Sequence, residues 1–266
     1  MNNPIITSAD NPKIQYVREL LRKKKFRIAE QVYVAEGVRL VEEVAKNEIR
    51  PKILLYSDAV SDRGYETIKY FQNIGVQIFQ VADYLLARIS GTKTSQGVIA
   101  VLSMEKKQFS AIPSFLLIVD HVRDPGNMGT LLRTARAGGV DGVMVLDGSV
   151  DVYSPKAVRA GMGAHFSLAI QTITVKRLLA YFDELYLNRP KTFAMVVTNG
   201  KPIWQSDFRQ PCALVVGGEA NGVSSEMLEI CDEKITIPMK DNTESLNAGI
   251  AGSVALFEVF RQRWQQ

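Results

Sequence analysis

The pattern of apolar and polar positions divides the chain into alternating short strands and amphipathic helices. Continuous apolar runs bounded by Gly, Pro, Asn or Asp predict strands that are buried on both faces. Apolar residues separated by three or four positions predict helices with one buried side. The first helix is expected over Lys13–Arg27, and its apolar side is formed by Ile14, Val17, Leu20 and Leu21.

The rest of this first part continues the alternation. Strands are expected at Gln31–Ala35, Lys52–Tyr56, Val76–Gln80 and Gly97–Leu102, and helices from Val38, over Tyr65–Asn73 and over Val81–Ile89. Alternation at this spacing favours a small α/β domain of three layers, in which helices cover both faces of one sheet.

A polar segment with a proline, Ser103–Ser114, separates this part from the remainder of the chain. We therefore predict a first domain at residues 1–105, a linker at 106–114 and a second domain at 115–266. The second domain is also α/β. Its strands are expected at Phe115–Val119, Gly142–Leu146, Thr192–Val197, Leu214–Val216 and Lys234–Ile237, and its helices at Met128–Gly138 with Asn127 as N-cap, in the first part of Tyr153–Ile170, at Val175–Leu187 and at the chain's end.

The stretch Leu214–Phe260 holds three loops rich in glycine or polar residues. The first is a turn with Gly217, Gly218 and Gly222, the second follows Pro238, and the third enters the final helix through Ser245 or Asn247. Loops that follow parallel strands meet at one edge of a sheet, where ligands of α/β proteins usually bind. The residues alone therefore predict a small-molecule site.

Positive charge is concentrated near the N-terminus. The chain of 266 residues has a net charge of +4, and residues 13–27 contain seven Lys or Arg and one Glu. Such a segment is either a solvated helix face or a contact for a polyanion such as RNA. Charge alone leaves both interpretations open.

Several kinds of site are not supported by the sequence. The loop after Phe115–Val119 is not G-x-G-x-x-G, and no GxxxxGK[ST] occurs, so dinucleotide and P-loop sites are disfavoured. Cys212 and Cys231 form no CxxC, and no Cys/His cluster has zinc spacing, so we expect no metal. The apolar runs are too short for a membrane span and no signal peptide opens the chain, so we expect a soluble cytoplasmic protein.

Three blocks of residues resemble the signature motifs of one family. They are Asn127-x-Gly129-x-x-x-Arg133, Gly217-x-Glu219-x-x-Gly222, and Ile237-Pro238-Met239 followed by Ser245-Leu246-Asn247. In this order they resemble the SpoU (TrmH-like) RNA ribose methyltransferases of the SPOUT superfamily. Upstream, Val34-Ala35-Glu36-Gly37-x-Arg39-Leu40 and Thr92-Lys93-Thr94-x-Gln96-Gly97 are similar to the accessory L30e-like RNA-binding domain that often precedes that catalytic domain.

The resemblance implies a fold, a cofactor and an assembly. The second domain would be an α/β-knot, with a deep trefoil knot in roughly Thr192–Phe260, preceded by the L30e-like domain. The protein would be a homodimer through its C-terminal domain, with each active site drawing on both subunits. The cofactor would be S-adenosylmethionine, and the positions that match the family's cofactor site are Thr198, Gly217, Gly218, Ile237, Met239 and Leu246.

The implied reaction is methyl transfer to a ribose 2′-hydroxyl of RNA, with rRNA favoured over tRNA because an accessory domain lies upstream. The matching catalytic positions are Asn127, Arg133, Glu219, Ser245 and Asn247. Residues expected to contact RNA are Arg22, Lys23, Lys24, Lys25, Arg39 and Lys93. Because a guanidinium does not give up its proton in proteins, it cannot serve as the base. We expect Arg133 to bind the target phosphate and stabilise the developing oxyanion, while the other polar residues align the sugar.

Simpler interpretations of these residues stay open at this point. Asn127 would also serve as a mere helix cap, and Arg133 and Glu219 as a structural ion pair. Ile237, Met239 and Leu246 would also serve as core residues. His165 is either a packed side chain or a base.

At the level of the protein, the alternatives are a non-catalytic RNA-binding or ribosome-assembly protein that retains the knot, a tRNA ribose methyltransferase, and an enzyme that methylates a base. The sequence also departs from the commoner family pattern at one loop. Gly161 stands where many members have Ser, so one hydroxyl that would touch RNA is missing.

Overall fold

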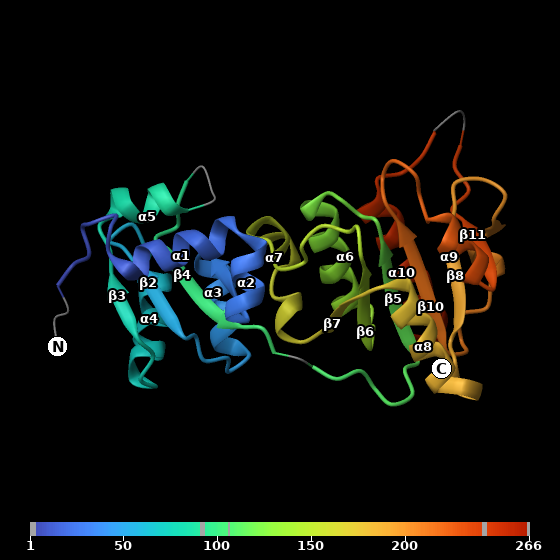
Figure 1. Cartoon of the computed structure of the whole chain (residues 1–266), viewed down its shortest axis with the longest axis horizontal. Helices are drawn as coiled ribbons and strands as arrows, with labels where there is room; N and C mark the ends of the chain where they lie inside the picture. Colours follow the sequence, from blue (N-terminus) through green and yellow to red (C-terminus); the bar gives the residue numbers. More distant parts are fainter. Residues whose placement is uncertain (1–3, 91–93, 106, 241–243, 265–266) are drawn as a thin grey trace. The chain divides into compact units, whose positions relative to one another are not determined.

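The computed structural model describes residues 4–90, 94–105, 107–240 and 244–264. It divides into two compact units (Figure 1). The first consists of Met1–Glu105 together with Tyr153–Phe166, and the second of Lys106–Val152 together with Ser167–Gln266. Within the described residues, no helix is both long enough and apolar enough to cross a membrane.

The first unit is built on a four-stranded mixed sheet in the order β1-β4-β2-β3. Strand β4 pairs antiparallel with β1 and β2, and β2 pairs parallel with β3. The strands are β1 (Val32–Glu36), β2 (Ile53–Tyr56), β3 (Ile78–Gln80) and β4 (Val98–Ser103), and the helices are α1 (Pro12–Arg22), α2 (Lys24–Glu30), α3 (Val38–Lys46), α4 (Asp62–Asn73), α5 (Asp83–Ile89) and α7 (Pro155–Gly161).

Two apolar cores lie on opposite faces of this sheet, because successive residues of a strand point to opposite sides. Ala100 of β4 belongs to the core that contains Val41 of α3 and Phe71 of α4. Its neighbour Val101 belongs to the core formed with α1 and α5. The sheet is therefore covered on both faces, as the alternation of strands and helices predicts.

The expectation of one continuous helix over Lys13–Arg27 is wrong. The chain leaves the helical conformation at Lys23, with φ −115° and ψ 111°, and α2 begins at the next residue. The physical reason is Arg27, which is buried and donates a hydrogen bond from Nη1 to the carbonyl of Leu20 at 2.5 Å. A cation at a helix C-terminus satisfies carbonyls that have no partner within the helix.

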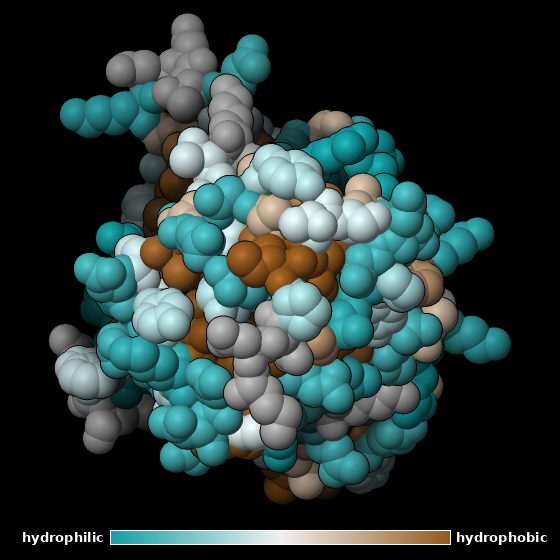
Figure 2. Space-filling model, turned by 90° about the vertical axis from the view of Figure 1, so that its left-hand side faces the viewer, coloured by the Kyte–Doolittle hydropathy of each residue, from teal (hydrophilic) through white to brown (hydrophobic). Residues whose placement is uncertain are grey.

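Polar side chains cover most of one face of this unit. Figure 2 shows hydrophilic residues over most of the visible face, with hydrophobic ones gathered near its centre. Arg22, Lys23, Lys24 and Lys25 surround the break between α1 and α2, and all four are exposed. The basic segment is therefore accessible to a partner.

The segment Tyr153–Phe166, which the sequence prediction places in the second domain, packs within the first unit. It forms α7 and a 3-10 turn, η1 (Ala164–Phe166). Val158 and Phe166 belong to the core that contains Val41 of α3 and Phe71 of α4. His165 is buried, with its ring centroid 5.5 Å from that of Tyr153, so it is a packed side chain.

The second unit contains a seven-stranded sheet in the order β7-β6-β5-β10-β8-β11-β9, with every pairing parallel. Its strands are β5 (Phe115–Asp120), β6 (Gly142–Leu146), β7 (Ala169–Ile173), β8 (Lys191–Met195), β9 (Lys201–Pro202), β10 (Cys212–Gly217) and β11 (Glu233–Thr236). Its helices are α6 (Pro125–Ala137), α8 (Val175–Leu185), α9 (Ser225–Ile230) and α10 (Ala248–Trp264), and it has 3-10 turns η2 (Tyr186–Asn188) and η3 (Ile203–Gln205).

Helices cover both faces of the central strands, which explains their continuous apolar runs. On one face, Phe182 of α8 and Met227 of α9 pack with Val215 of β10. On the other face, α10 approaches closely at Gly252, where a Cβ would come 2.3 Å from Leu131 of α6 and 3.2 Å from Val216 of β10. Gly252 therefore allows the last helix to pack closely against both α6 and β10.

The prediction that Asn127 caps α6 is wrong. The N-cap is Asp124, whose Oδ1 accepts a hydrogen bond from the backbone N–H of Asn127 at 2.9 Å. Pro125 occupies the first helical turn, where its fixed φ and missing N–H are tolerated. The side chain of Asn127 is thus released from capping and is available for another contact.

Candidate active site

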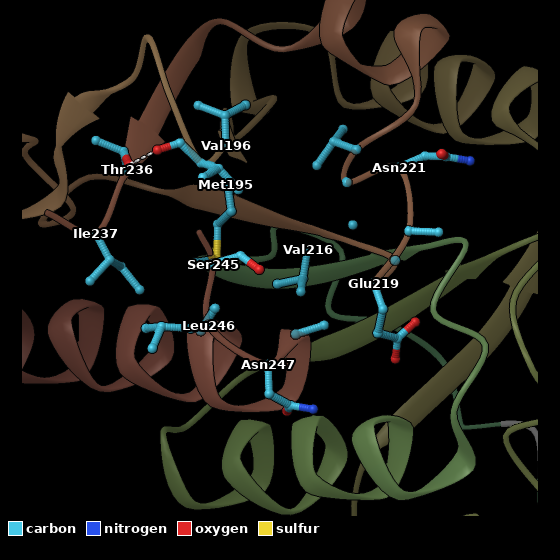
Figure 3. Close-up of a pocket in the computed structure, with 18 of the residues that line it drawn as sticks. Met195, Val196, Val216, Glu219, Asn221, Thr236, Ile237, Ser245, Leu246 and Asn247 are labelled. Atoms are coloured by element: carbon cyan, nitrogen blue, oxygen red, sulfur yellow. Dashed lines mark hydrogen bonds between the residues drawn. The ribbon is translucent and has the colours of Figure 1, made fainter. Parts of the chain in front are cut away.

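A cavity of about 680 Å³ lies in the second unit at the carboxyl ends of β8, β10 and β11 (Figure 3). It is bordered by Met195 at the end of β8, Gly217 at the end of β10 and Thr236 at the end of β11. The start of α10 closes it through Ala248 and Ala251. The loops that the sequence predicts to converge do meet here, at the usual ligand position of a parallel sheet.

The turn after β10 presents its backbone to the cavity because glycine brings the chain unusually close to itself. A Cβ at Gly217 would lie 2.0 Å from the carbonyl carbon of Gly222, and one at Gly218 would lie 2.1 Å from the carbonyl oxygen of His121. Gly218 and Gly222 also exchange two backbone hydrogen bonds of 3.1 and 3.0 Å. Any side chain at the first two positions would force this turn open.

One side of the cavity is apolar. Ile237, Met239 and Leu246 line it, and none of the three is buried, so the interpretation that they are core residues does not hold. Figure 3 shows Ile237 and Leu246 on this side, with Met195 nearby. These side chains form a surface that suits a flat, apolar ring system.

The opposite side is polar and brings together residues from all three sequence blocks. Asn127 donates from Nδ2 to Oε1 of Glu219 at 2.5 Å. A Cβ on Gly249 would lie 3.1 Å from Oδ1 of Asn127 and 3.2 Å from Oδ1 of Asn247, so both amide oxygens lie beside the first turn of α10. Ser245 and Asn247 both line the cavity.

Glu219 is held in its ionised form. Burial raises the pKa of its carboxyl, but hydrogen bonds from the Asn127 side chain and from backbone N–H groups, that of Arg123 among them, outweigh this effect. The pKa therefore lies below its ordinary value. An ionised carboxylate accepts hydrogen bonds only, so Glu219 orients donors such as amides and hydroxyls.

Two predicted site residues lie outside this arrangement. Neither Asn127 nor Arg133 is among the described residues that line the cavity: Asn127 is linked to it through Glu219, whereas Arg133 is exposed on α6. Glu219 bonds Asn127 and the backbone of Arg123, which gives no support to an ion pair with Arg133. Thr198 is also exposed and follows Met195–Val197, the segment that does line the cavity.

Sequence reasoning missed several residues of the cavity. Met195, Val196, Val216, Asn221 and Thr236 line it, and Thr236 donates a hydrogen bond to the carbonyl of Val197 at 3.0 Å. Most of them stand at or next to the last residue of a parallel strand. The rule that ligands bind at carboxyl ends of such strands would have identified them once the strand boundaries were known.

In the first unit, the predicted RNA contact Arg39 lies outside the basic segment and beside a small cavity. Arg39 is exposed and lines a smaller cavity of about 170 Å³ with Thr94 and Gln96. Glu36 lies in the same cavity, where it is nearly buried and pairs with Arg159 at 2.9 Å. Lys93 lies outside the described residues.

Other chemistries find little support in the part of the chain that the structure describes. No group of three or more His, Cys, Asp or Glu residues is arranged to hold a metal ion there. Burial raises the pKa of Cys212 to about 11 and that of Cys231 to about 12, so neither thiol is a ready nucleophile at neutral pH.

Comparisons with known families give one match in each half of the chain, and each match contains the motifs described for that half. A model of the SpoU rRNA methylase family matches residues 114–257. A model of the MRM3-like substrate binding domain matches residues 11–100. The first match contains the cavity, and the second contains the basic segment and Arg39.

Individual proteins and structures are similar over nearly the whole chain. The 23S rRNA (guanosine(2553)-2′-O)-methyltransferase RlmP of Bacillus subtilis is 31% identical over 96% of this chain and 98% of its own length. The human mitochondrial rRNA methyltransferase 3 is 27% identical over 94% of this chain and 72% of its own length. The crystal structure of the SpoU methyltransferase AviRb from Streptomyces viridochromogenes, in complex with the cofactor AdoMet, is similar with a TM-score of 0.84 at 26% identity, covering 96% of this chain and 100% of that one.

Proposed function

The chain belongs to the SpoU rRNA methylase family, and from this premise we propose that it methylates a ribose 2′-hydroxyl of ribosomal RNA. The cofactor is S-adenosylmethionine, and the reaction is transfer of its methyl group to RNA ribose. The observation that carries the proposal is the polar group at one side of this cavity, where Glu219 and Asn247 line it and Asn127 is hydrogen-bonded to Glu219. A cofactor pocket alone would not need such a cluster.

The cavity fits this cofactor in size and in chemistry. Its volume of about 680 Å³ lies within the range of small-molecule sites. The apolar side formed by Ile237 and Leu246 suits adenine, and the backbone of Gly217–Gly222 offers polar groups to the remainder of the molecule. When bound, S-adenosylmethionine supplies an electrophilic methyl group on a positively charged sulfur.

The polar residues act by holding the acceptor sugar in line with that methyl group. Glu219 orients the amide of Asn127, and Asn247 is oriented by the hydrogen bond that its Oδ1 accepts from the backbone N–H of Ile250 at 3.2 Å. Groups that are fixed before the substrate arrives lose little entropy when they position it. We assign to them the alignment of the ribose.

We also propose that a second copy of the chain completes the site. Arg133 is exposed outside the cavity, yet the reaction needs a cation beside the target phosphate and the developing oxyanion. Helix α10 carries an apolar face to solvent, with Ile250 51%, Val254 42% and Phe257 47% exposed. A homodimer formed through this face would cover it and would let Arg133 of one subunit serve the other subunit's cavity.

The course of the last residues supports the proposal of a knot. Strand β11 lies beyond β8, away from β10, whereas α10 returns to pack against α6 and β10. The chain therefore crosses back over the ends of strands that it has already formed. We propose that this return carries α10 through the preceding loop.

The function is tested with purified protein, labelled S-adenosylmethionine and large-subunit rRNA transcribed without modifications, with a tRNA transcript as the alternative acceptor. We expect label in rRNA, and nuclease and mass analysis should place it on a ribose. Label in tRNA or on a base would refute the proposed substrate. Binding of S-adenosylmethionine by calorimetry without transfer to either RNA would favour a non-catalytic protein.

A further inference from the structure

A second cavity, of about 670 Å³, adjoins the glycine turn of the second unit. It is lined by His121, Arg123 and Asp124 from the loop after β5 and by residues of the segment from Gly218 to Ser225. Glu219 lines this cavity as well as the cofactor cavity. The second cavity therefore lies next to the polar side where the acceptor ribose is aligned, yet nothing above gives it a role.

His121 is held in this cavity in an unusual backbone conformation. Its φ is +55°, in the left-handed region that residues other than glycine seldom adopt. Two glycines make room for it: a Cβ at Gly218 would collide with its carbonyl oxygen at 2.1 Å, and one at Gly148 would lie 2.6 Å from Cδ2 and Nε2 of its ring. Strained conformations persist where the surroundings fix them, and they are frequent at functional sites.

A buried carboxylate fixes the ring of His121. Asp120 is fully buried, and its Oδ1 lies 2.5 Å from Nδ1 of His121. Its Oδ2 accepts a hydrogen bond from the backbone N–H of Ser224 at 2.7 Å, so the carboxylate cannot turn away. This contact occupies Nδ1 and leaves Nε2 as the ring nitrogen that can bond a ligand, on a side chain that is 45% exposed.

Arg123 supplies the cavity with a positive charge. It is exposed two residues after His121, and its backbone N–H contacts Oε2 of Glu219 at 3.4 Å. The loop thus offers a ring nitrogen and a cation to the same cavity. The backbone of RNA presents the complement, because each nucleotide carries a hydroxyl donor and a phosphate anion.

We propose that this cavity binds the RNA backbone beside the acceptor ribose, with Nε2 of His121 accepting a hydrogen bond from the 2′-hydroxyl of a neighbouring nucleotide and Arg123 binding a phosphate. The inference rests on the proposed function, because it requires RNA as the substrate. Asp120 is a positioning residue in it, since it acts through the ring of His121. The contact would select RNA over DNA at a nucleotide that is not itself methylated.

Two substitutions test the two contacts separately. His121→Asn removes the ring but tolerates the left-handed backbone, since Asn is among the residues that adopt it most readily. Arg123→Gln removes the charge. Arg177→Gln is the matched control, because Arg177 is an exposed arginine of α8 in the same unit that pairs with Glu184.

The first measurement is binding of a short mixed-sequence single strand, prepared once as RNA and once as DNA. We expect His121→Asn to weaken RNA binding by about three- to tenfold, the effect of one hydrogen bond, and to leave DNA binding unchanged. Arg123→Gln should weaken both equally and reduce the slope of log affinity against log salt by about one. The control should change neither. An unchanged RNA-to-DNA ratio in His121→Asn would overturn the proposal.

The second measurement is methylation of unmodified large-subunit rRNA. His121→Asn should raise KM for RNA by about three- to tenfold with kcat nearly unchanged and with unchanged affinity for S-adenosylmethionine. A fall in kcat without a rise in KM would instead place His121 in the chemical step and refute a binding role. If the wild type methylates no RNA, the proposed function fails; if it does and His121→Asn behaves identically, the inference alone fails.

Discussion

The two units of the chain are built on sheets of different kinds, and their cavities differ accordingly. In the mixed sheet of the first unit, β4 runs antiparallel to β1 and β2. The carboxyl ends of its strands are therefore divided between two edges of the sheet. In the second unit all seven strands are parallel, and their carboxyl ends share one edge. The first unit holds a cavity of about 170 Å³ and the second one of about 680 Å³.

The two cavities also differ in the polar groups that line them, which are side chains in one and include backbone in the other. At the smaller cavity the polar groups are long side chains, such as Arg39 and Gln96, on the surface of the unit. At the larger one the backbone of Gly217–Gly222 forms a wall. An exposed basic side chain such as Arg39 suits a large polyanion, whereas a wall of fixed backbone suits one small molecule. The difference agrees with the match of residues 11–100 to the MRM3-like substrate binding domain and with a small-molecule cavity in the second unit.

The largest effect is expected when a methyl group is added to the backbone turn that borders the larger cavity. In Gly217→Ala the new Cβ would meet the backbone of Gly222 at 2.0 Å, so the turn must open. We expect affinity for S-adenosylmethionine to fall by about 100-fold or more, measured by calorimetry, because both the apolar and the backbone contacts shift. Gly138→Ala is the control, since its φ of −86° is open to any residue and its added Cβ would come no nearer than 3.3 Å to the atoms around it. Wild-type affinity in Gly217→Ala would show that the turn does not hold the cofactor.

The next test asks whether the larger cavity is complete in one chain. Arg133→Ala should lower kcat by about 100-fold, the usual cost of removing a donor that stabilises developing charge. If Arg133 serves the partner's cavity, dimers that pair an Arg133→Ala chain with a Gly217→Ala chain contain one intact site. A random mixture of the two variants should then recover about a quarter of the wild-type rate. No recovery in a mixture shown to contain the paired species would contradict a shared site.

A smaller effect is expected on stability, where a partly buried hydrogen-bonding arginine of the second unit is compared with an exposed one. Arg263 of α10 donates to the carbonyls of Phe208, Ser114 and Gln210 at 2.8, 2.9 and 2.8 Å. Arg263→Ala should lower the free energy of unfolding by about 2 kcal/mol, since three carbonyls lose a charged donor. Urea denaturation measures this. Arg261→Ala, which removes an exposed pair with Glu258, should cost less than about 0.5 kcal/mol. Equal losses would mean that the three hydrogen bonds of Arg263 stabilise the fold no more than the surface ion pair of Arg261 does.

The smallest expected effect concerns the charge of Glu219. Because the folded state lowers the pKa of this carboxyl below 4.5, it stabilises the fold at pH values above 4.5 and loses that contribution as the pH falls below it. The difference in Tm between wild type and Glu219→Gln should therefore be present at neutral pH and shrink in acid. A difference that stays constant down to acid pH would show that the hydrogen bonds do not depend on the charge.

The sequence predicted the parts of this structure that depend on local pattern and order. The alternation of apolar runs located most strands, and the motif blocks identified Gly217, Glu219 and Asn247 as members of one site. The blocks succeeded because each follows or precedes a strand whose end lies at the same edge. That geometry follows from chain direction, which the sequence contains.

Other features could not be derived because they depend on contacts between distant parts. A helical pattern treats Arg27 as a surface residue, whereas its burial against Leu20 breaks the helix in two. The release of Asn127 from capping depends on Asp124 and on the partner Glu219, 92 positions away. The exposure of Arg133 outside the cavity is a property of how α6 packs, which no motif records.

Helix α10 has one further consequence. Within two turns it lines the cofactor cavity with Ala248 and Ala251 and turns Ile250 and Val254 to solvent. If the exposed side is where two chains associate, occupancy of the cavity and association become linked equilibria, because both act on the same rigid segment. Dilution of the protein would then change its affinity for the methyl donor, and the donor would change subunit association by the same factor.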